Sequence, residues 1–274
     1  MQLTVADDRT LEVHDSTNGV EAPLTVIWHH GSPQTGAPLG PHLRSASARD
    51  IRWISFARAG YGATSALANR SVADGAADVE QIADALGLGR FAVMGASGGG
   101  PHAIAAAALL GDRVFAAATF ATLAPYTTEF DWFAGMAGGG PALVSALQGR
   151  AAREDFEATA EFDGESFNAR DYAALSDGWV SLDEDVQLAG AAGSAALIDD
   201  DLAFVTPWGI ELDSIAAPVL LAHGGDDRVV PAAHSRWLVD RLPDAELWFR
   251  PRDGHISILD ASTLALDWLV QRGS

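Results

Sequence analysis

The strongest constraint on the fold is an alternation of short apolar runs and longer amphipathic segments along the chain. Eight runs have the length and apolar character of β-strands; they are residues 3–6, 10–14, 24–29, 52–57, 91–94, 114–120, 219–222 and 247–249. From the third run onward they alternate with helical patterns at residues 72–86, 101–110, 232–242 and 258–270. This alternation predicts a mostly parallel sheet with helices on both faces. The first two runs alternate polar and apolar residues and predict an antiparallel hairpin that turns at Asp7 and Asp8.

A turn made of small residues follows the apolar run at residues 91–94. It reads Gly95-Ala96-Ser97-Gly98-Gly99 and leads into an alanine-rich helical stretch. The glycines permit the strained backbone of a sharp strand-to-helix turn, which exposes the serine hydroxyl above the first N–H groups of the helix. Because Gly and Ser are also common in ordinary turns, the pentapeptide alone leaves a purely structural turn open.

A carboxylate and a histidine follow Ser97 later in the chain. The apolar run at residues 219–222 leads into a loop that contains Asp226 and Asp227, and His255 lies 28 positions beyond Asp227. A serine hydroxyl is nearly inert until a histidine takes its proton, and that histidine needs a carboxylate to fix its tautomer and orientation. We therefore expect Ser97, Asp227 and His255 to act together.

The turn after residues 24–29 supplies a candidate oxyanion hole. It reads His30-Gly31-Ser32-Pro33. Backbone N–H groups are suited to hold the negative charge that develops on a carbonyl oxygen during acyl transfer, and we expect those of Ser32 and Gly98 to do so. The alternative is an ordinary strand-ending turn, for which Gly-Ser-Pro is also suitable.

A long segment separates the strand-like runs at residues 114–120 and 219–222. It has roughly 95 residues, too many for one crossover helix and its loops. We expect residues 125–207 to form an inserted helical cap over a core of residues 1–124 and 208–274. Its helical patches are residues 142–148, 153–161, 169–179, 183–191 and 195–204. Candidate substrate-pocket residues are His30, His102, Trp132, Phe133, Trp179 and Trp208. For any one of the aromatic residues the alternative is packing of the cap on the core.

Five separated motifs together resemble the α/β-hydrolase superfamily over nearly the whole chain. They are His30-Gly31, residues 58–62, residues 95–99, residues 224–231 and Gly254-His255. The resemblance implies an α/β-hydrolase fold, with an eight-stranded mostly parallel sheet, helices on both faces and a helical cap. The chain departs from the family at Ala57 and Ala59, where Asp and Pro are usual.

The same resemblance implies a catalytic triad in the chain order Ser97, Asp227, His255. The family's acid lies four residues before the loop proline, which favours Asp227 over Asp226. Epoxide hydrolases and haloalkane dehalogenases of this fold are disfavoured, because they carry an aspartate where Ser97 stands.

Composition narrows the chemistry further. The chain of 274 residues contains no cysteine and no lysine, so a thiol nucleophile, disulfides, cysteine-ligated zinc and Schiff-base chemistry are all excluded. The net charge of −20 makes nucleic acid an unsuitable partner. No histidine pair has the spacing of a zinc site, so we expect no metal. Without a signal-peptide pattern or a long apolar run, we expect no membrane association and a cytoplasmic location.

These observations predict a cofactor-free serine hydrolase, a monomer or homodimer, that cleaves a small or medium hydrophobic carboxylic ester or lactone through an acyl-enzyme. One alternative is hydrolysis of a carbon–carbon bond or an amide with the same triad. A second alternative is a non-catalytic small-molecule binding protein that retains the triad, because fold does not fix function.

Overall fold

The computed structural model describes residues 1–273 and contains an eight-stranded sheet. The strands are β1 (Gln2–Thr4), β2 (Thr10–Asp15), β3 (Leu24–His29), β4 (Ile51–Phe56), β5 (Phe91–Ala96), β6 (Val114–Phe120), β7 (Val219–Gly224) and β8 (Ala245–Arg250). Their spatial order is β1-β2-β4-β3-β5-β6-β7-β8. β2 pairs antiparallel with β1 and β4, and the other neighbours pair in parallel. The predicted sheet and its opening hairpin are confirmed.

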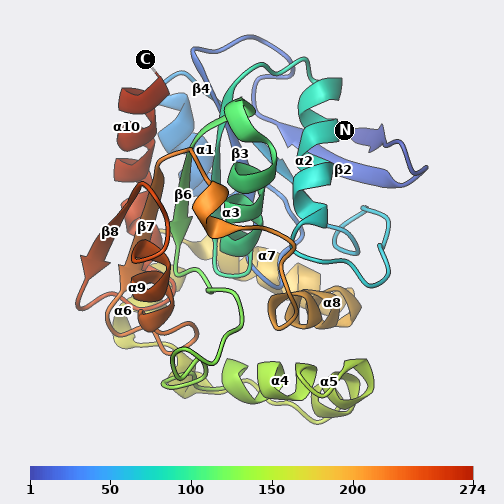
Figure 1. Cartoon of the computed structure of the whole chain (residues 1–274), viewed down its shortest axis with the longest axis vertical. Coiled ribbons are helices and arrows are strands. Elements are labelled where there is room, and N and C mark those ends of the chain that lie inside the picture. The colour runs from blue at the N-terminus through green and yellow to red at the C-terminus, as the bar shows by residue number, and fades with distance from the viewer. Residues whose placement is uncertain (274) are drawn as a thin grey trace.

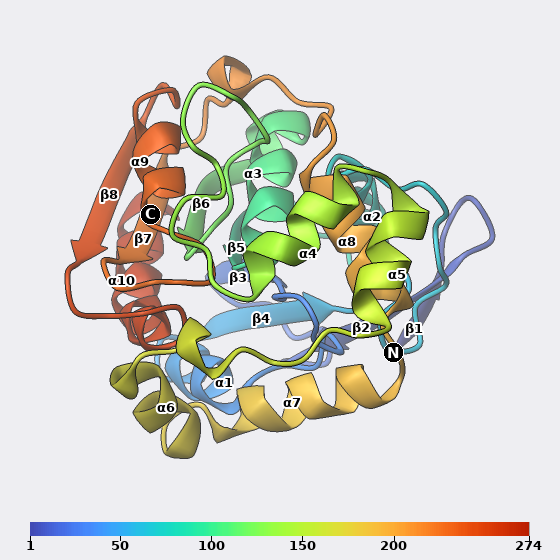
Figure 2. The same ribbon diagram turned by 90° about the horizontal axis from the view of Figure 1, so that it is seen from below.

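The central strands are buried on both faces of the sheet. In β3, Val26 and Trp28 belong to the hydrophobic cluster that includes residues of α1 (Gly40–Ser47) and α10 (Ser262–Gly273). Ile27, between them, belongs to the cluster that includes residues of α2 (Asp74–Ala85), α3 (Gly99–Leu109) and α9 (Ala233–Val239). Successive strand residues point to opposite faces, so each strand supplies both cores. Figure 2 shows the two helical layers on opposite sides of the strands, which confirms the predicted fold class.

Two helical elements differ from the sequence expectation. No helix was predicted at α1, whose buried residues are only His42 and Ala46, too short an apolar pattern to indicate a helix. Pro41 lies in its first turn, where the missing N–H costs no hydrogen bond. The helix expected at residues 258–270 is also divided. Its first part is a 3₁₀-helix, η4 (Ser257–Ala261), and α10 follows it.

The segment between β6 and β7 is helical, and we call its residues 125–207 the helical insertion. It contains α4 (Gly139–Ala146), α5 (Arg150–Glu157), η2 (Gly164–Ser166), α6 (Ala169–Ser176), α7 (Val180–Ala191) and α8 (Ala195–Phe204). The remaining 3₁₀-helices, η1 (Gly111–Arg113) and η3 (Leu212–Ser214), lie outside it. Figure 1 shows α4 to α8 gathered at the end of the sheet toward which β7 and β8 point. The insertion therefore lies beside the loops that follow the parallel strands.

Candidate active site

Ser97 occupies the turn between β5 and α3. Its φ of +51° lies in the left-handed region, which a serine adopts only where the surroundings hold it there. The Ser97 N–H donates to the Phe120 carbonyl at 2.8 Å, and its carbonyl accepts from the Gly100 N–H at 2.9 Å. A Cβ on Gly99 would collide with the His29 carbonyl, so only glycine lets α3 start this close to β3. Ser97 is partly exposed although its neighbours in the turn are buried.

A buried carboxylate and a histidine follow β7 and β8, at the carboxyl ends of the parallel strands, as Ser97 does after β5. The Asp227 Oδ2 is 2.9 Å from Nδ1 of His255. The other oxygen, Oδ1, accepts hydrogen bonds of 2.9 Å from the N–H groups of Val229 and Val230. Because a carboxylate only accepts, Nδ1 of His255 carries the hydrogen and Nε2 keeps its lone pair while the ring is neutral. The ring therefore has the tautomer that a general base requires.

Asp227 and His255 shift each other's pKa. Burial alone would raise the pKa of Asp227, but the charge and hydrogen bond of His255, with His223 Nε2 3.5 Å away, lower it below its ordinary value. Burial alone would lower the pKa of His255, but Asp227, with a contribution from Asp171, raises it above 6.5. The pair therefore favours an ionised acid and a more basic imidazole.

The structure separates the two adjacent aspartates of the acid loop. The Asp227 side chain is fully buried against His255. The Asp226 side chain is about half exposed, accepts from Asn168 Nδ2 at 3.0 Å and lies 3.5 Å from Arg228. Of the two carboxylates, only that of Asp227 bonds the His255 ring.

The two predicted oxyanion donors lie on neighbouring segments. A Cβ on Gly98 would collide with the Ser32 Oγ and would lie 2.9 Å from Cζ of Phe204. Arg58 holds the Ser32 turn from behind, because its guanidinium donates to the His30 carbonyl and, at 2.9 Å, to the Ser32 Oγ. His30 is buried in this corner and accepts from the Arg58 N–H at 3.0 Å. The corner is therefore built around Arg58.

A carboxylate from the helical insertion completes this corner. Asp200 of α8 is fully buried, and its oxygens lie 2.7 Å from Arg58, 2.6 Å from Arg70 and 2.9 Å from the Tyr61 hydroxyl. It also accepts from the Ser32 hydroxyl. Burial alone would raise the pKa of Asp200, but the two guanidinium groups hold it well below its ordinary value. We call these five residues the Asp200 cluster.

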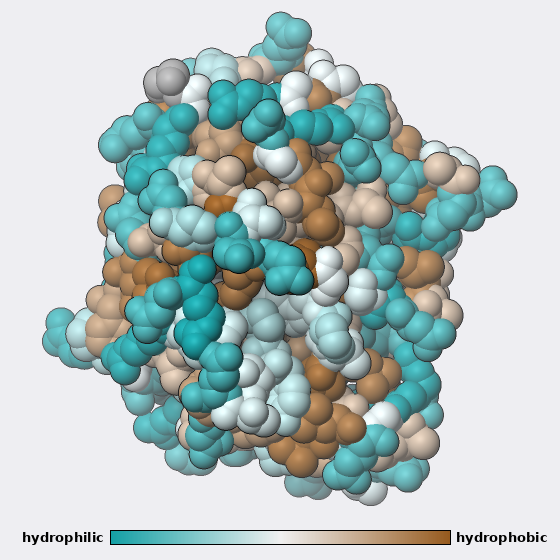
Figure 3. Space-filling model, in the orientation of Figure 1, coloured by the Kyte–Doolittle hydropathy of each residue, from teal (hydrophilic) through white to brown (hydrophobic). Residues whose placement is uncertain are grey.

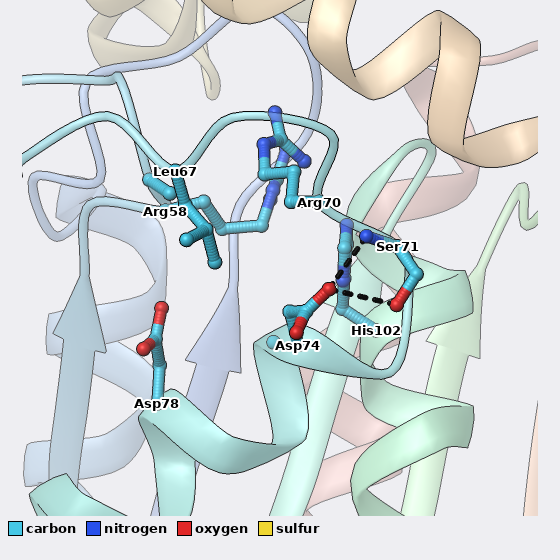
Figure 4. Close-up of a pocket in the computed structure, with 9 residues that line it drawn as sticks. Arg58, Leu67, Arg70, Ser71, Asp74, Asp78 and His102 are labelled. Carbon is cyan, nitrogen blue, oxygen red and sulfur yellow. Dashed lines mark hydrogen bonds between the residues drawn. The ribbon is translucent and has the colours of Figure 1, made fainter. Parts of the chain in front are cut away.

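His102 lies behind this cluster and lines a small pocket. Its Nδ1 is 3.1 Å from the Val72 carbonyl, and its Nε2 is 3.8 Å from Asp200. Burial lowers the pKa of His102 to about 4, so the ring is neutral. Figure 4 shows His102 next to Asp74 and Ser71, with Arg58 and Arg70 further along the same pocket; Asp74 accepts from the Ser71 N–H and hydroxyl. The pocket has about 10 Å³ of space, enough for about one water.

The four aromatic residues predicted to line the substrate pocket divide into two groups. Trp132, Phe133 and Trp208 contribute to one hydrophobic cluster that also includes Phe204. Trp179 packs elsewhere, with its ring centroid 5.1 Å from that of His42 and its indole N–H donating to Asp260 at 2.9 Å. Trp179 thus fastens the insertion to α1 and to the segment before α10.

Several residues of the site escaped the sequence analysis. Asp171, Asp200 and Phe204 come from the insertion, and Arg70 comes from the loop before α2. None of them stands in a motif, because their partners lie far away along the chain. His223 of β7 also lies against Asp227, with Nε2 2.7 Å from the Val230 carbonyl.

A family model described as the α/β hydrolase fold matches residues 25–262. The chain belongs to this family. The α/β hydrolase from Nitrosomonas europaea named pimeloyl-[acyl-carrier protein] methyl ester esterase is 30% identical over 185 residues, which cover 66% of this chain and 69% of that protein. A protein of the same name from Aromatoleum aromaticum is 36% identical over 86 residues, 31% of this chain. The match spans only 32% of the Aromatoleum protein.

Solved structures of this family have the same architecture. A thermophilic esterase from Thermogutta terrifontis superposes with a TM-score of 0.73 at 18% identity, over 100% of this chain and 99% of that one. Relatives of this α/β hydrolase therefore include proteins named as esterases.

Two features are absent from the described part of the chain, a membrane-spanning helix and a group of metal-binding side chains. Across residues 1–273, no helix is long and apolar enough to cross a bilayer, and no three His, Asp or Glu side chains are grouped to hold a metal ion. On the face in Figure 3, hydrophobic surface is scattered among hydrophilic side chains. The exposed apolar residues of the insertion include Val144 and Leu188.

Proposed function

We propose that this α/β hydrolase is a cofactor-free serine hydrolase that cleaves a small or medium hydrophobic carboxylic ester or lactone. The observation that carries the proposal is the buried pair of Asp227 and His255, 2.9 Å apart. Both follow parallel strands at their carboxyl ends, as Ser97 does after β5. The left-handed conformation of Ser97 supports it, because such strain gathers at functional sites.

The proposed reaction begins with attack of the Ser97 Oγ on the carbonyl carbon of the ester. Nε2 of His255 takes the hydroxyl proton, and the electron pair of the C=O bond moves onto oxygen. The N–H groups of Ser32 and Gly98 stabilise this oxyanion. When the intermediate collapses, the bond to the alcohol oxygen breaks, His255 protonates that oxygen, and the acyl group stays on Ser97.

The second half of the reaction regenerates the serine. A water molecule gives a proton to His255 and attacks the acyl carbon. The carboxylic acid leaves, and the proton returns from His255 to the Ser97 oxygen. Throughout, Asp227 stays ionised, fixes the ring and stabilises the imidazolium. The lowered pKa of Asp227 agrees with this role.

The helical insertion acts as a cap in this proposal. Its helices lie at the end of the sheet toward which β7 and β8 point, and the Phe204 ring lies against Gly98, next to the proposed oxyanion site. Phe204 belongs to the hydrophobic cluster that also contains Trp132 and Trp208. An apolar cover of this kind excludes water and favours a hydrophobic acyl group.

The names of the relatives favour an ester as the substrate. Both curated relatives are named as methyl ester esterases, and the structural neighbour as an esterase. We assign the ester class to this chain on that basis, with a small-molecule substrate. A lactone is an internal ester and is cleaved by the same steps.

The test is covalent labelling by a fluorophosphonate together with hydrolysis of p-nitrophenyl acetate and butyrate. We expect labelling of the wild-type protein, no labelling of Ser97→Ala, and a kcat for Ser97→Ala that is lower by about 10⁴-fold or more with an unchanged circular dichroism spectrum. Labelling that survives in Ser97→Ala contradicts the assignment. Ligand binding with negligible turnover of esters, amides and dienoates by the wild type indicates a binding protein instead.

A further inference from the structure

A second carboxylate contacts the proposed catalytic histidine, and it comes from the helical insertion. Asp171 lies in the first turn of α6, where its side chain accepts from the Asn168 N–H at 3.2 Å and completes a capping box. A capping carboxylate is ordinarily exposed on its own helix. The Asp171 side chain is instead fully buried, because it also reaches into the loop after β8.

In that loop Asp171 accepts hydrogen bonds from three consecutive backbone N–H groups. Its Oδ2 accepts from His255 at 3.1 Å, and its Oδ1 accepts from Ile256 at 3.0 Å and from Ser257 at 2.8 Å. The Ser257 hydroxyl also donates to Oδ1 at 2.8 Å. These N–H groups stand at the start of η4, where a helix leaves its first donors without internal partners. The Asp171 side chain therefore provides an acceptor for each of these three N–H groups.

The Asp171 carboxylate lies so close to the loop of His255 that it requires a glycine there. A Cβ on Gly254 would lie within 3 Å of all three atoms of the Asp171 carboxyl group, so only glycine fits beside His255. Asp171 bonds the backbone of His255 and leaves its ring to Asp227. One carboxylate thus orients the imidazole, and the other fixes the backbone from which it projects.

We propose that Asp171 is a positioning residue. It fixes the His255 backbone so that Nδ1 of the ring bonds Asp227 while Nε2 is directed toward the Ser97 hydroxyl. The inference rests on the proposed role of His255 as the base. It gives the insertion a role in positioning the base as well as in covering the site, because Asp171 joins α6 to the loop of His255.

The charges around His255 determine what a test can measure. Asp227 of the acid loop contacts the His255 ring, and His223 of β7 lies 3.5 Å from the Asp227 carboxylate; Asp171 of α6 contacts the His255 backbone. Asp253, two residues before His255, is neutralised by two guanidinium groups, those of Arg170 at 2.8 Å and Arg250 at 3.7 Å. Removal of the Asp171 charge therefore takes away one of two uncompensated negative charges, and the pKa of His255 falls.

A matched control exists on the next helix. Asp185 of α7 is also a buried carboxylate of the insertion that accepts from the core, from the Thr35 N–H at 3.1 Å and from the Thr35 hydroxyl. It makes no hydrogen bond to the loop of His255. Asp185→Asn therefore measures how much a weakened contact between the insertion and the core lowers activity, while the contact between Asp171 and His255 stays intact.

The experiment compares Asp171→Asn, Asp185→Asn and wild type by the pH dependence of kcat/KM and by an NMR titration of the His255 ring, assigned from His255→Gln. For Asp171→Asn we expect kcat to fall by about tenfold or more, KM to change less, and both the acid limb and the ring titration to move down by about 0.5 to 1 pH unit. For Asp185→Asn we expect neither curve to move. Equal losses of kcat in both variants with an unmoved His255 titration overturn the proposal.

A second variant covers the case in which Asp171→Asn fails to fold. Ser257→Ala removes two hydrogen bonds of the loop and keeps the Asp171 charge. We expect a several-fold lower kcat with the His255 titration near that of wild type; a folded Ser257→Ala with unchanged kcat overturns the proposal. The NMR titration needs no turnover. A wild type that neither labels nor hydrolyses esters therefore refutes the proposed function, while the contact between Asp171 and His255 is still tested.

Discussion

The core and the helical insertion differ in how they use polar side chains. Residues 125–207 carry 16 acidic and 3 basic side chains, whereas the rest of the chain carries 21 and 14. The core is held together by strands whose apolar residues alternate between two hydrophobic clusters. The insertion is fastened to it by buried carboxylates on three helices, Asp171, Asp185 and Asp200. Three of the acidic residues that give the insertion its excess of negative charge are therefore the ones that attach it to the core.

Two of the three attachments meet the proposed site, and the third, Asp185, bonds Thr35 outside it. Asp200 holds the oxyanion corner through Arg58 and Ser32, Asp185 holds Thr35 a few residues further along, and Asp171 holds the loop of His255. The core supplies the proposed reacting groups, and Asp171 and Asp200 of the insertion hold the segments from which these groups project.

The largest effect is expected in the core, at the acid. Asp227→Asn removes the charge that orients His255 and should lower kcat by about 10⁴-fold, as loss of the orienting acid does in the serine-protease template. Asp226→Asn, one residue away, should cost far less, because its side chain contacts Asn168 and solvent. Steady-state kinetics of both variants on p-nitrophenyl butyrate measure the difference. A larger loss at Asp226 would reverse the assignment.

The attachment at the oxyanion corner should govern stability more than any other tie between the two regions. Asp200→Asn leaves Arg58 and Arg70 buried without a counter-charge, and should lower the free energy of unfolding by about 3–5 kcal/mol. Asp199→Asn removes a carboxylate paired with the surface residue Arg150, and should cost about 1 kcal/mol or less. Urea unfolding measures both. Equal effects contradict a buried anchor.

The smallest effect concerns the cover that the insertion provides. Burial of each methylene is worth about 0.8 kcal/mol, so kcat/KM should rise up to about 15-fold from p-nitrophenyl acetate to butyrate. Phe204→Ala, beside Gly98, should reduce this preference, and Phe162→Ala, on the exposed surface of the insertion, should leave it unchanged. A flat or inverted preference across acetate, butyrate and hexanoate argues against an apolar pocket under the insertion.

The sequence predicts the core better than the insertion, for a physical reason. A strand buried on both faces and a turn such as residues 95–99 consist of consecutive residues, so a short stretch of sequence is enough to predict them. The contacts of Asp171 with His255 and of Asp200 with Arg58 span 84 and 142 positions, and nothing local marks either aspartate. The helices of the insertion were predicted, but which of their side chains face the core depends on how those helices pack.

The position of β7 and β8 at one edge of the sheet has a consequence for the order of assembly. Ribosomes deliver the chain from the N-terminus, so Ser97 and the insertion emerge before either Asp227 or His255 exists. A nascent chain can form the Ser97 turn while its hydroxyl is still unreactive. In the proposed mechanism, Ser97 is activated only after β7 and β8 have added to the sheet, and Asp171 on α6 is then already present to bind the loop of His255.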